Sequence, residues 1–364
     1  MQLAQRGQHA PSTLILEQRH GYENDRTWCF WGDSKTPFAQ QTTYQWQQFK
    51  VSNAGHEISI DCANTPYRML AADQFYNAAL AALETVPQMQ LHMNSNVMAE
   101  PQFHNGRWHV ETAHGSFSAG RVVDTRPIKF SDNSALMWQS FYGFEIDCVL
   151  PVFDPSCVEL MDFSVATPDR VAFTYVLPLT AGRALVEFTV FAKSPFTADA
   201  LSRDLQNSIV QLLKGASFTV LRSEQGVLPM GLDVTVTARP VADPSYVHVG
   251  LFAGAARPAT GYAFQRIQRW AIACGRKLAN GGLPMAHPKE PFLQGWMDTL
   301  FLNVIRQQPE LAPALFMALF SGVASHRVIR FLSERGGFND FVALSLALPQ
   351  KPFLRQLFSL SRWP

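Results

Sequence analysis

The sequence predicts a mixed α/β (α+β) fold in which a Rossmann-like nucleotide-binding domain carries an inserted antiparallel sheet and is followed by C-terminal helices. Three observations predict this fold. The short apolar segment Thr13–Glu17 ends in an acid and has the pattern of a buried parallel strand. Alternating apolar and polar residues in the middle of the chain indicate antiparallel strands. After Gly281 the sequence changes to aromatic-rich segments with helical periodicity.

The first residues have the pattern of the second half of a dinucleotide-binding unit. Gln2–Gly7 is expected to end a helix, with Gly7 as its cap. In such a unit a strand, a glycine-rich turn, a helix and a second strand precede an acid that binds the ribose hydroxyl groups. Glu17 stands in the place of that acid, and a charged strand end without a function is the alternative interpretation. The first strand and the G-x-G-x-x-G turn are not found in this sequence, so we expect an N-terminally incomplete domain.

The remaining elements are predicted by the same patterns. Strands are expected within Tyr44–Ile60 and at Arg107–Thr112, Phe117–Ala119, Arg121–Asp124, Phe141–Ile146, Ala172–Leu177, Ala184–Phe191 and Tyr246–Ala253. Helices are expected at Ala71–Leu83, Leu201–Leu213, Tyr262–Ala279, Phe292–Arg306, Pro313–Glu334 and Asn339–Leu348. These elements divide the chain into a discontinuous nucleotide-binding domain (residues 1–40, 66–130 and 226–285), a substrate-binding sheet domain (41–65 and 131–225) and a C-terminal helical region (286–364).

The composition excludes some classes of function. The 30 basic and 29 acidic residues give a net charge of +1, which argues against nucleic acid as a partner because phosphate binding needs a basic excess. The five cysteines show no C-x-x-C or zinc spacing and suit a reducing compartment. The histidines show no ligand spacing, so we assign no metal. With no secretory signal and no long uncharged apolar run, we expect a cytoplasmic protein.

Nine short segments follow one another in a characteristic order along the chain. They are Glu23–Trp31 (ENDRTWCFW), Tyr67–Leu83 (beginning YRMLAADQFYNAAL), Val122–Pro127 (VVDTRP), Phe141–Ile146 (FYGFEI), Met161–Phe163 (MDF), Tyr175–Leu179 (YVLPL), Leu185–Thr189 (LVEFT), Gly226–Gly231 (GVLPMG) and Gly254–Gln268 (GAARPATGYAFQRIQ). Together they resemble the bacterial lycopene cyclase family. The number and order of the segments carry the resemblance, because no single motif is decisive.

The resemblance implies an isomerase that closes the linear ends of lycopene to β-ionone rings, giving γ- and then β-carotene. A proton adds to a terminal alkene, a neighbouring double bond attacks the resulting cation, and the ring loses a proton. The family uses FAD in its reduced form, with NAD(P)H as the source of electrons, and the anionic flavin is implied to stabilise the cation. Since lycopene is insoluble in water, the resemblance also implies peripheral binding to the inner membrane, with residues 292–358 as the first segment to consider.

The candidate proton donor is Glu187 in the segment LVEFT. An acid that protonates an alkene must be neutral until used, and burial in an apolar site raises the pKa of a carboxyl group. In an extended strand Glu187 shares a face with Leu185, Thr189 and Phe191. The position matches the first glutamate of the FLEET motif of the plant family members, while Phe188 replaces the second. A glutamate that points into water from a half-exposed strand is the alternative.

The second candidate region is the segment RPATGY, which begins at Arg257. Many relatives carry His before this proline, whereas an arginine cannot accept a proton near neutrality. We therefore expect Arg257 to act through its charge, by holding a flavin phosphate or an anionic flavin ring; a surface arginine before a turn is the alternative. Thr260 and Gly261 are expected to open a helix whose amide groups face the flavin. The cofactor-binding residues expected in this segment are Pro258, Thr260, Gly261 and Tyr262.

Further residues are expected to contact the dinucleotide. Glu17 would hold the adenosine ribose, and Arg26 and Thr27 would lie near the flavin or its pyrophosphate. Asp124 and Arg126 would lie beside the adenine half, with capping of a turn as the alternative for Asp124. The aromatic residues expected either to line a tunnel for the polyene or to belong to the core are Trp28, Phe30 and Trp31.

Two other functions remain open from the sequence. One is an FAD-dependent monooxygenase or reductase that acts on another apolar substrate. The aspartate that the wider flavoenzyme family often carries in this region is not found between Val249 and Tyr262, which weakens this alternative. The other is an inactive, N-terminally truncated copy that cannot hold FAD without the glycine-rich turn.

Overall fold

A seven-stranded sheet forms the centre of the computed structural model, which describes residues 3, 6–7, 10–127, 134–233 and 243–360. In spatial order its strands are β16 (Phe218–Leu232), β12 (Ala135–Cys148), β15 (Arg183–Ala192), β14 (Val171–Pro178), β13 (Cys157–Asp162), β4 (Gln48–Asn53) and β5 (His56–Asp61). Neighbouring strands run antiparallel, except for the parallel pair of β13 and β4. The predicted antiparallel sheet is therefore confirmed.

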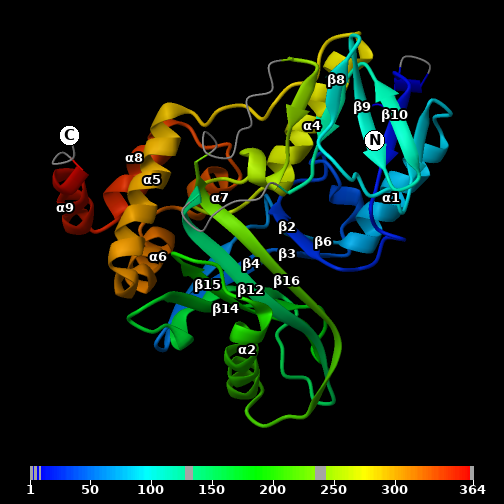
Figure 1. Cartoon of the computed structure of the whole chain (residues 1–364). Coiled ribbons are helices and arrows are strands. Elements are labelled where there is room, and N and C mark those ends of the chain that lie inside the picture. Colours follow the sequence, from blue (N-terminus) through cyan, green and yellow to red (C-terminus); the bar gives the residue numbers. More distant parts are fainter. Residues whose placement is uncertain (1–2, 4–5, 8–9, 128–133, 234–242, 361–364) are drawn as a thin grey trace.

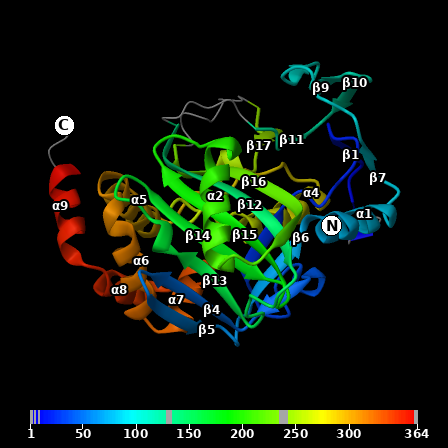
Figure 2. The ribbon, with the colours of Figure 1, turned by 90° about the horizontal axis from the view of Figure 1, so that it is seen from below.

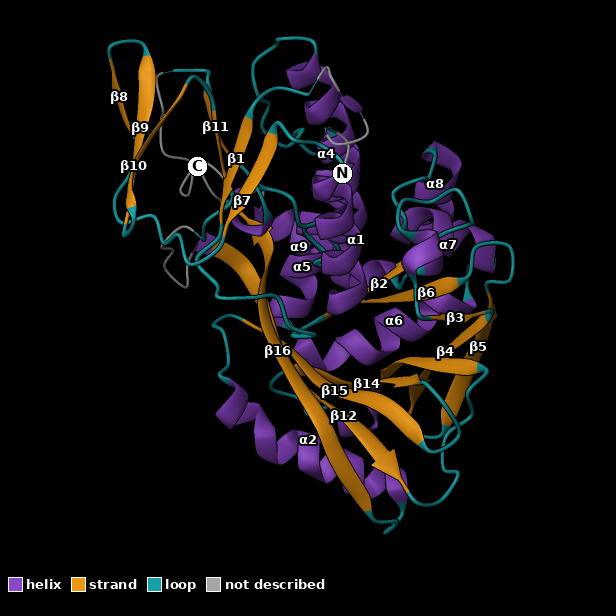
Figure 3. Cartoon of the chain, turned by 90° about the vertical axis from the view of Figure 1, so that its right-hand side faces the viewer, coloured by secondary structure: helices purple, strands orange, loops and turns teal. Residues whose placement is uncertain are grey.

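Different helices cover the two faces of this sheet (Figure 3). Helix α2 (Ala198–Leu213) packs against β12 and β15 on one face, while α5 (Phe292–Gln307) and α6 (Ala312–Ser321) contact the sheet on the other. Alternate side chains of β15 therefore enter two separate cores, because successive residues of a strand point to opposite faces. Phe188 belongs to the core beneath α2, and Leu185 belongs to the core on the opposite face.

A second part of the fold consists of small sheets and two helices beside the main sheet (Figure 1). Its paired strands are β1 (Thr13–Leu16) with β7 (Met89–His92), β2 (Thr27–Trp31) with β6 (Tyr67–Ala71) and β3 (Tyr44–Trp46), β8 (Gln102–His104) with β9 (Arg107–Thr112) and β10 (Gly115–Ala119), and β11 (Val122–Asp124) with β17 (Tyr246–His248). Its helices are α1 (Ala72–Glu84) and α4 (Phe264–Ala279). The predicted strands Arg107–Thr112 and Phe117–Ala119 and the predicted helix Ala71–Leu83 are confirmed, with small differences at their ends.

Three predictions in this part need comment. The strand at Thr13 is parallel, as expected, but it is half-buried, because its sheet has two strands within the described residues. The predicted strand Tyr246–Ala253 ends at His248, where Gly250 takes a positive φ of 103° and begins a turn. The predicted helix end Gln2–Gly7 lies largely outside the described residues.

The C-terminal region continues with α7 (Ser325–Leu332), α8 (Phe338–Ala347) and α9 (Gln350–Leu360), which lie together at the far end of the molecule (Figure 2). The predicted single helix Pro313–Glu334 is wrong, since the chain bends by 118° between α6 and α7. A Cβ atom on Gly322 would lie 2.7 Å from the Cβ atom of Ala347, so a glycine at the bend lets α6 end against α8.

No single helix within the described ranges has the length and apolar composition needed to cross a membrane. The bent pair Pro309–Ser321 and Ser325–Leu332 reaches that length and composition only when its two parts are taken together.

Strand β16 was not expected from the sequence, and it extends the main sheet past the predicted domain boundary at residue 226 to Leu232. Glycine and proline are unfavourable inside strands, and this strand contains Gly226, Pro229 and Gly231. Its position explains why they are tolerated: β16 is the edge strand of the sheet, where a proline without an amide hydrogen leaves no ladder bond unmade.

Candidate active site

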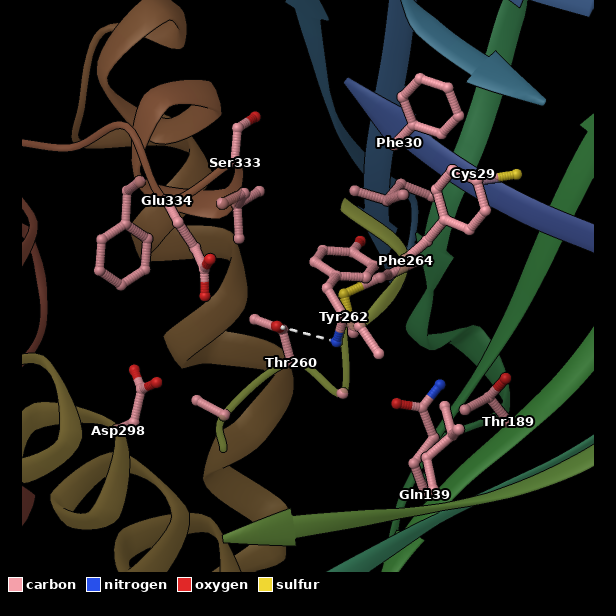
Figure 4. A pocket seen from close by; sticks show the side chains of 18 of the residues that line it. Cys29, Phe30, Gln139, Thr189, Thr260, Tyr262, Phe264, Asp298, Ser333 and Glu334 are labelled. Carbon is pink, nitrogen blue, oxygen red and sulfur yellow. Dashed lines mark hydrogen bonds between the residues drawn. The ribbon is translucent and has the colours of Figure 1, made fainter. Parts of the chain in front are cut away.

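An apolar cavity of about 910 Å³ lies between the main sheet and the helices of the C-terminal half. Strands β2, β12, β14, β15 and β16 provide one wall, and the loop before α4 together with α4 to α9 provides the other. Figure 4 shows Gln139 and Thr189 on the sheet side and Ser333 and Glu334 on the helical side. The aromatic residues Trp28, Phe30 and Trp31 line the cavity, as one of the two interpretations of the sequence predicted.

Glu187 lies on the wall of this cavity, in the middle of β15. The alternating side chains of Leu185, Glu187, Thr189 and Phe191 all line the cavity, so the predicted common face is confirmed. Burial raises the pKa of the Glu187 carboxyl well above its usual range, and the nearby carboxyl of Glu224 raises it further. Glu187 is therefore a carboxyl whose neutral form is favoured by its surroundings, on the wall of an apolar cavity.

Glu224, on β16, is a second carboxyl in the cavity wall and was missed by the sequence analysis. It is 5% exposed, and its Oε2 atom accepts a hydrogen bond of 2.8 Å from the hydroxyl of Thr27. The same oxygen is ion-paired with Arg222, whose Nε atom donates to Glu145 at 2.5 Å. The signal in the sequence is the spacing of Arg222 and Glu224, which places both on one face of a strand, but that strand was not predicted.

Arg257 does not line the cavity. Its side chain is completely buried, and the guanidinium donates to both carboxylate oxygens of Asp298 on α5, at 3.0 and 3.1 Å. A third bond of 2.6 Å reaches the carbonyl oxygen of Phe331, whose ring lies 4.0 Å from the guanidinium carbon. A buried cation needs an ion pair of this kind. Arg257 thus links the loop before α4 to α5 and α7. These contacts do not support the prediction that its charge faces a flavin.

The segment from Thr260 to Tyr262 lines the cavity, but as a turn and not as the start of a helix. Helix α4 begins at Phe264, and the amides of Thr260 and Gly261 donate to the carbonyl of Arg257 at 3.4 and 2.9 Å. The hydroxyl of Thr260 accepts from the amide of Tyr262 at 3.3 Å (Figure 4). These two amides are therefore hydrogen-bonded within the turn, which corrects the prediction that Thr260 and Gly261 open the helix. Pro258 is not among the lining residues.

The surroundings of this turn fit the ring system of a flavin. Three buried polar atoms near the cavity have no hydrogen-bond partner in the described structure: Gln139 Oε1, Trp31 Nε1 and Ser333 Oγ. Buried polar groups normally have a partner, and a flavin ring carries both donors and acceptors. Gly261 has a positive φ of 69°, and a Cβ atom there would lie 2.9 Å from Gln139 Oε1, so the glycine keeps this space open.

The other predicted cofactor residues are divided between the cavity and the small sheets. Arg26 and Thr27 line the cavity, whereas Glu17, Asp124 and Arg126 do not. The carboxylate of Glu17 accepts two bonds from Arg19, at 2.9 and 3.1 Å. Asp124 accepts from the amide of Arg126 at 3.0 Å, as in the capped turn that the sequence left as an alternative.

The contacts of Glu17, Asp124 and Arg126 do not decide their assignment to the adenosine half, which stays a prediction. In the ranges that the structure covers, no three His, Cys, Asp or Glu side chains are grouped so that they could hold a metal ion.

The fold defines a structural class, a mixed α/β fold that is similar to solved structures described as reductase-like and as monooxygenases. A geranylgeranyl bacteriochlorophyll reductase-like protein from Thermoplasma acidophilum is similar with a TM-score of 0.59 at 12% identity, covering 99% of this chain and 94% of that one. A protein from Photorhabdus luminescens described as an FAD-containing monooxygenase has a TM-score of 0.51 at 12% identity, with 94% of each chain covered. These similarities establish the fold class.

The family follows from the sequence comparison. The family model described as lycopene cyclase protein matches residues 1–358, and the chain belongs to this family. A lycopene beta-cyclase from Pseudescherichia vulneris is 24% identical over 352 residues, which cover 93% of this chain and 88% of the relative. A second lycopene beta-cyclase, from Paracoccus sp., is 33% identical over 149 residues, or 40% of this chain and 37% of the relative. The resemblance inferred from the ordered segments is thus confirmed.

Proposed function

We propose that this protein cyclises the linear end groups of lycopene to β-ionone rings, without net oxidation or reduction, and that it uses reduced FAD with NAD(P)H as the source of electrons. The observation that carries the proposal is Glu187, a carboxyl with a raised pKa on the wall of an apolar cavity, in a chain of the lycopene cyclase family. The same cavity is large enough and apolar enough to take the end of a polyene.

Glu187 supplies the proton that starts the reaction. Its O–H bond breaks as a C–H bond forms at the terminal alkene, which leaves a tertiary cation. The π electrons of a neighbouring double bond then form the ring bond, and the ring loses a proton to restore a double bond. The faces of aromatic side chains stabilise cations, and Phe141 and Phe173 line the cavity near Glu187. The apolar wall also keeps out water, which would otherwise capture the cation.

The residues that fit a flavin ring are cavity-lining residues with unpartnered polar atoms, namely Trp31, Gln139 and Ser333, together with Gly261. When bound, reduced flavin supplies a fixed negative charge that stabilises the cationic intermediate. Thr260 and Tyr262 shape the wall on which the ring would lie.

We also propose that the protein binds peripherally to the cytoplasmic side of the inner membrane, where lycopene is found. Large apolar side chains are exposed on the C-terminal helices: Phe292 on α5 at 88%, Leu346 on α8 at 75% and Phe358 on α9 at 70%. Helix α9 also lines the cavity through Phe353 and Leu357. Apolar side chains of this kind favour insertion at a lipid surface, so α9 would connect the membrane with the cavity.

The test is to incubate the protein with lycopene in liposomes, FAD and a reductant, and to separate the carotenoids by chromatography. We expect γ- and β-carotene from the wild type, and at least a 100-fold lower rate from Glu187→Gln, as for the loss of a general acid. Glu159→Gln is the matched control, because Glu159 is a glutamate of the same sheet that does not line the cavity. Unchanged lycopene at full flavin occupancy would refute the proposal, and substrate-dependent oxygen consumption would support a monooxygenase instead.

A further inference from the structure

Four residues on neighbouring strands lie in one row across the main sheet. Tyr175 on β14 pairs with Glu187 on β15, Glu187 pairs with Gly143 on β12, and Gly143 pairs with Glu224 on β16. Residues that lie directly opposite each other on neighbouring strands point to the same face of the sheet. Glu187 and Glu224 therefore both point into the cavity, and the residue between them has no side chain.

Gly143 creates the space in which the two carboxyl groups meet. A Cβ atom on Gly143 would lie 2.6 Å from Cγ of Glu187, which is closer than any real contact of this kind. The side chain of Glu187 thus leans over the glycine, on the same face and in the same row as Glu224, and the carboxyl of Glu224 is close enough to raise the pKa of Glu187. Two ionised carboxylates side by side repel each other, so a proton on one of the two groups is favoured.

The surroundings of the two glutamates are unequal. Glu224 has Arg222 and Thr27 as partners, and both donate to its Oε2 atom. Arg222 is held in place by Glu145 on β12 and by the hydroxyl of Thr27 at 2.9 Å. Among the described contacts, the ion pair with Arg222 is made by Glu224, so we place the shared proton on Glu187.

The other titratable groups that face this pair stay neutral. The hydroxyl groups of Tyr175 on β14 and Tyr67 on β6 lie 3.0 Å apart, and burial raises the pKa of both well above its usual range. Burial also raises the pKa of the Cys29 thiol on β2 to about 12. Arg222 is accordingly the cation that balances the pair.

We propose that Glu224 is a positioning residue for the proton donor: it shares one proton with Glu187 across Gly143 and keeps that proton on Glu187 at neutral pH. This inference rests on the proposed function of Glu187. When the O–H bond of Glu187 breaks, its electron pair stays on the carboxylate. The proton that the ring later loses returns to the glutamate pair, while the electrons of the broken C–H bond form the ring double bond. The pair thus holds one proton before and after each turnover.

The pH profile of cyclisation tests this role through Glu224→Gln. Glutamine removes the negative charge that keeps the proton on Glu187, so Glu187 ionises at lower pH. We expect the alkaline limb of the rate profile to move to lower pH by about one unit or more. Above the new midpoint the cyclisation rate should be roughly tenfold lower than that of the wild type. Below that midpoint the rate should stay within a few-fold of wild type. Glu224→Asp keeps the negative charge, so its alkaline limb should lie close to that of the wild type. Glu159→Gln should leave the alkaline limb unchanged. An equal loss at every pH would overturn the proposal.

A second measurement does not depend on activity. The carbonyl stretch of a protonated carboxyl group in the infrared spectrum of the protein without lycopene should disappear in Glu187→Gln and titrate at lower pH in Glu224→Gln. If it titrates identically in wild type and Glu224→Gln, the shared proton is refuted. If it shifts as expected but the wild type leaves lycopene unchanged, the shared proton is supported and the proposed function fails.

Discussion

The buried ion pair of Arg257 and Asp298 can be tested by replacing Asp298 with asparagine. Asparagine preserves the shape of the side chain but removes the charge that neutralises a guanidinium with 0% exposure. Breaking a buried pair by removing one partner costs about 3–5 kcal/mol of unfolding free energy. The bond to the carbonyl of Phe331 and the contact with its ring remain, so we expect the lower end of this range.

Urea denaturation of the flavin-free protein measures this cost without a contribution from ligand binding. The control is Glu57→Gln, which breaks the exposed pair of Glu57 and Lys50, 2.7 Å apart, and should change stability by less than about 1 kcal/mol. A cost below about 1 kcal/mol for Asp298→Asn would refute the reasoning.

The double variant Arg257→Met/Asp298→Leu separates structure from catalysis. Replacing both partners of a buried pair with apolar residues is often neutral or stabilising, so we expect unfolding free energy within about 1 kcal/mol of wild type or above it. Retained cyclisation would show that Arg257 acts through structure alone. A folded double variant that leaves lycopene unchanged would support the catalytic role predicted from the sequence.

Two further predictions concern the cavity wall and the face of β15. Gly261→Ala should lower the unfolding free energy by about 1–2 kcal/mol, because φ at this position is 69°. It should also weaken flavin binding, because the new Cβ atom would lie 2.9 Å from Gln139 Oε1. Fluorescence titration with FAD measures the second effect. Gly55→Ala, with φ of 84° in open space, is the control for backbone strain alone, and equal flavin binding in both variants would contradict the close contact. Phe188→Glu restores the second acid of the FLEET motif but places a carboxylate in the core beneath α2. We therefore expect a loss of several kcal/mol of unfolding free energy in urea denaturation and no gain in cyclisation. A stable Phe188→Glu variant with raised activity would show that this side chain faces the cavity.

Local patterns in the sequence were sufficient for much of the fold and, together with the family resemblance, for choosing Glu187 as the candidate proton donor. The alternation around Glu187 identified the face of β15 that lines the cavity, because a period of two is a property of any strand. The same rule explains why Phe188 can replace the second acid of the FLEET motif: the neighbouring position points into the core beneath α2.

What the sequence did not predict depends on contacts between distant residues. Glu224 was not predicted as a site residue because Gly226 and Pro229 make the sequence of β16 unlike that of a strand. The position of β16 at the edge of the sheet is what allows this glycine and this proline. The buried state of Arg257 depends on Asp298, 41 residues further along the chain, and no local pattern indicates that pairing. The bend between α6 and α7 likewise depends on the packing of Gly322 against Ala347.

The two walls of the cavity differ in how freely they can change. The glutamate row belongs to a sheet whose strands are tied by ladders of backbone hydrogen bonds on both sides of Gly143, and a shift of one strand would separate the carboxyls. The opposite wall, which includes Phe316, Leu319 and Leu348, comes from α6 and from the helices and connections that follow it. Substitutions there are expected to alter which hydrocarbon chains fit while leaving proton transfer intact. The architecture thus gives protein engineers a helical wall for selecting the substrate and a fixed sheet for the chemistry.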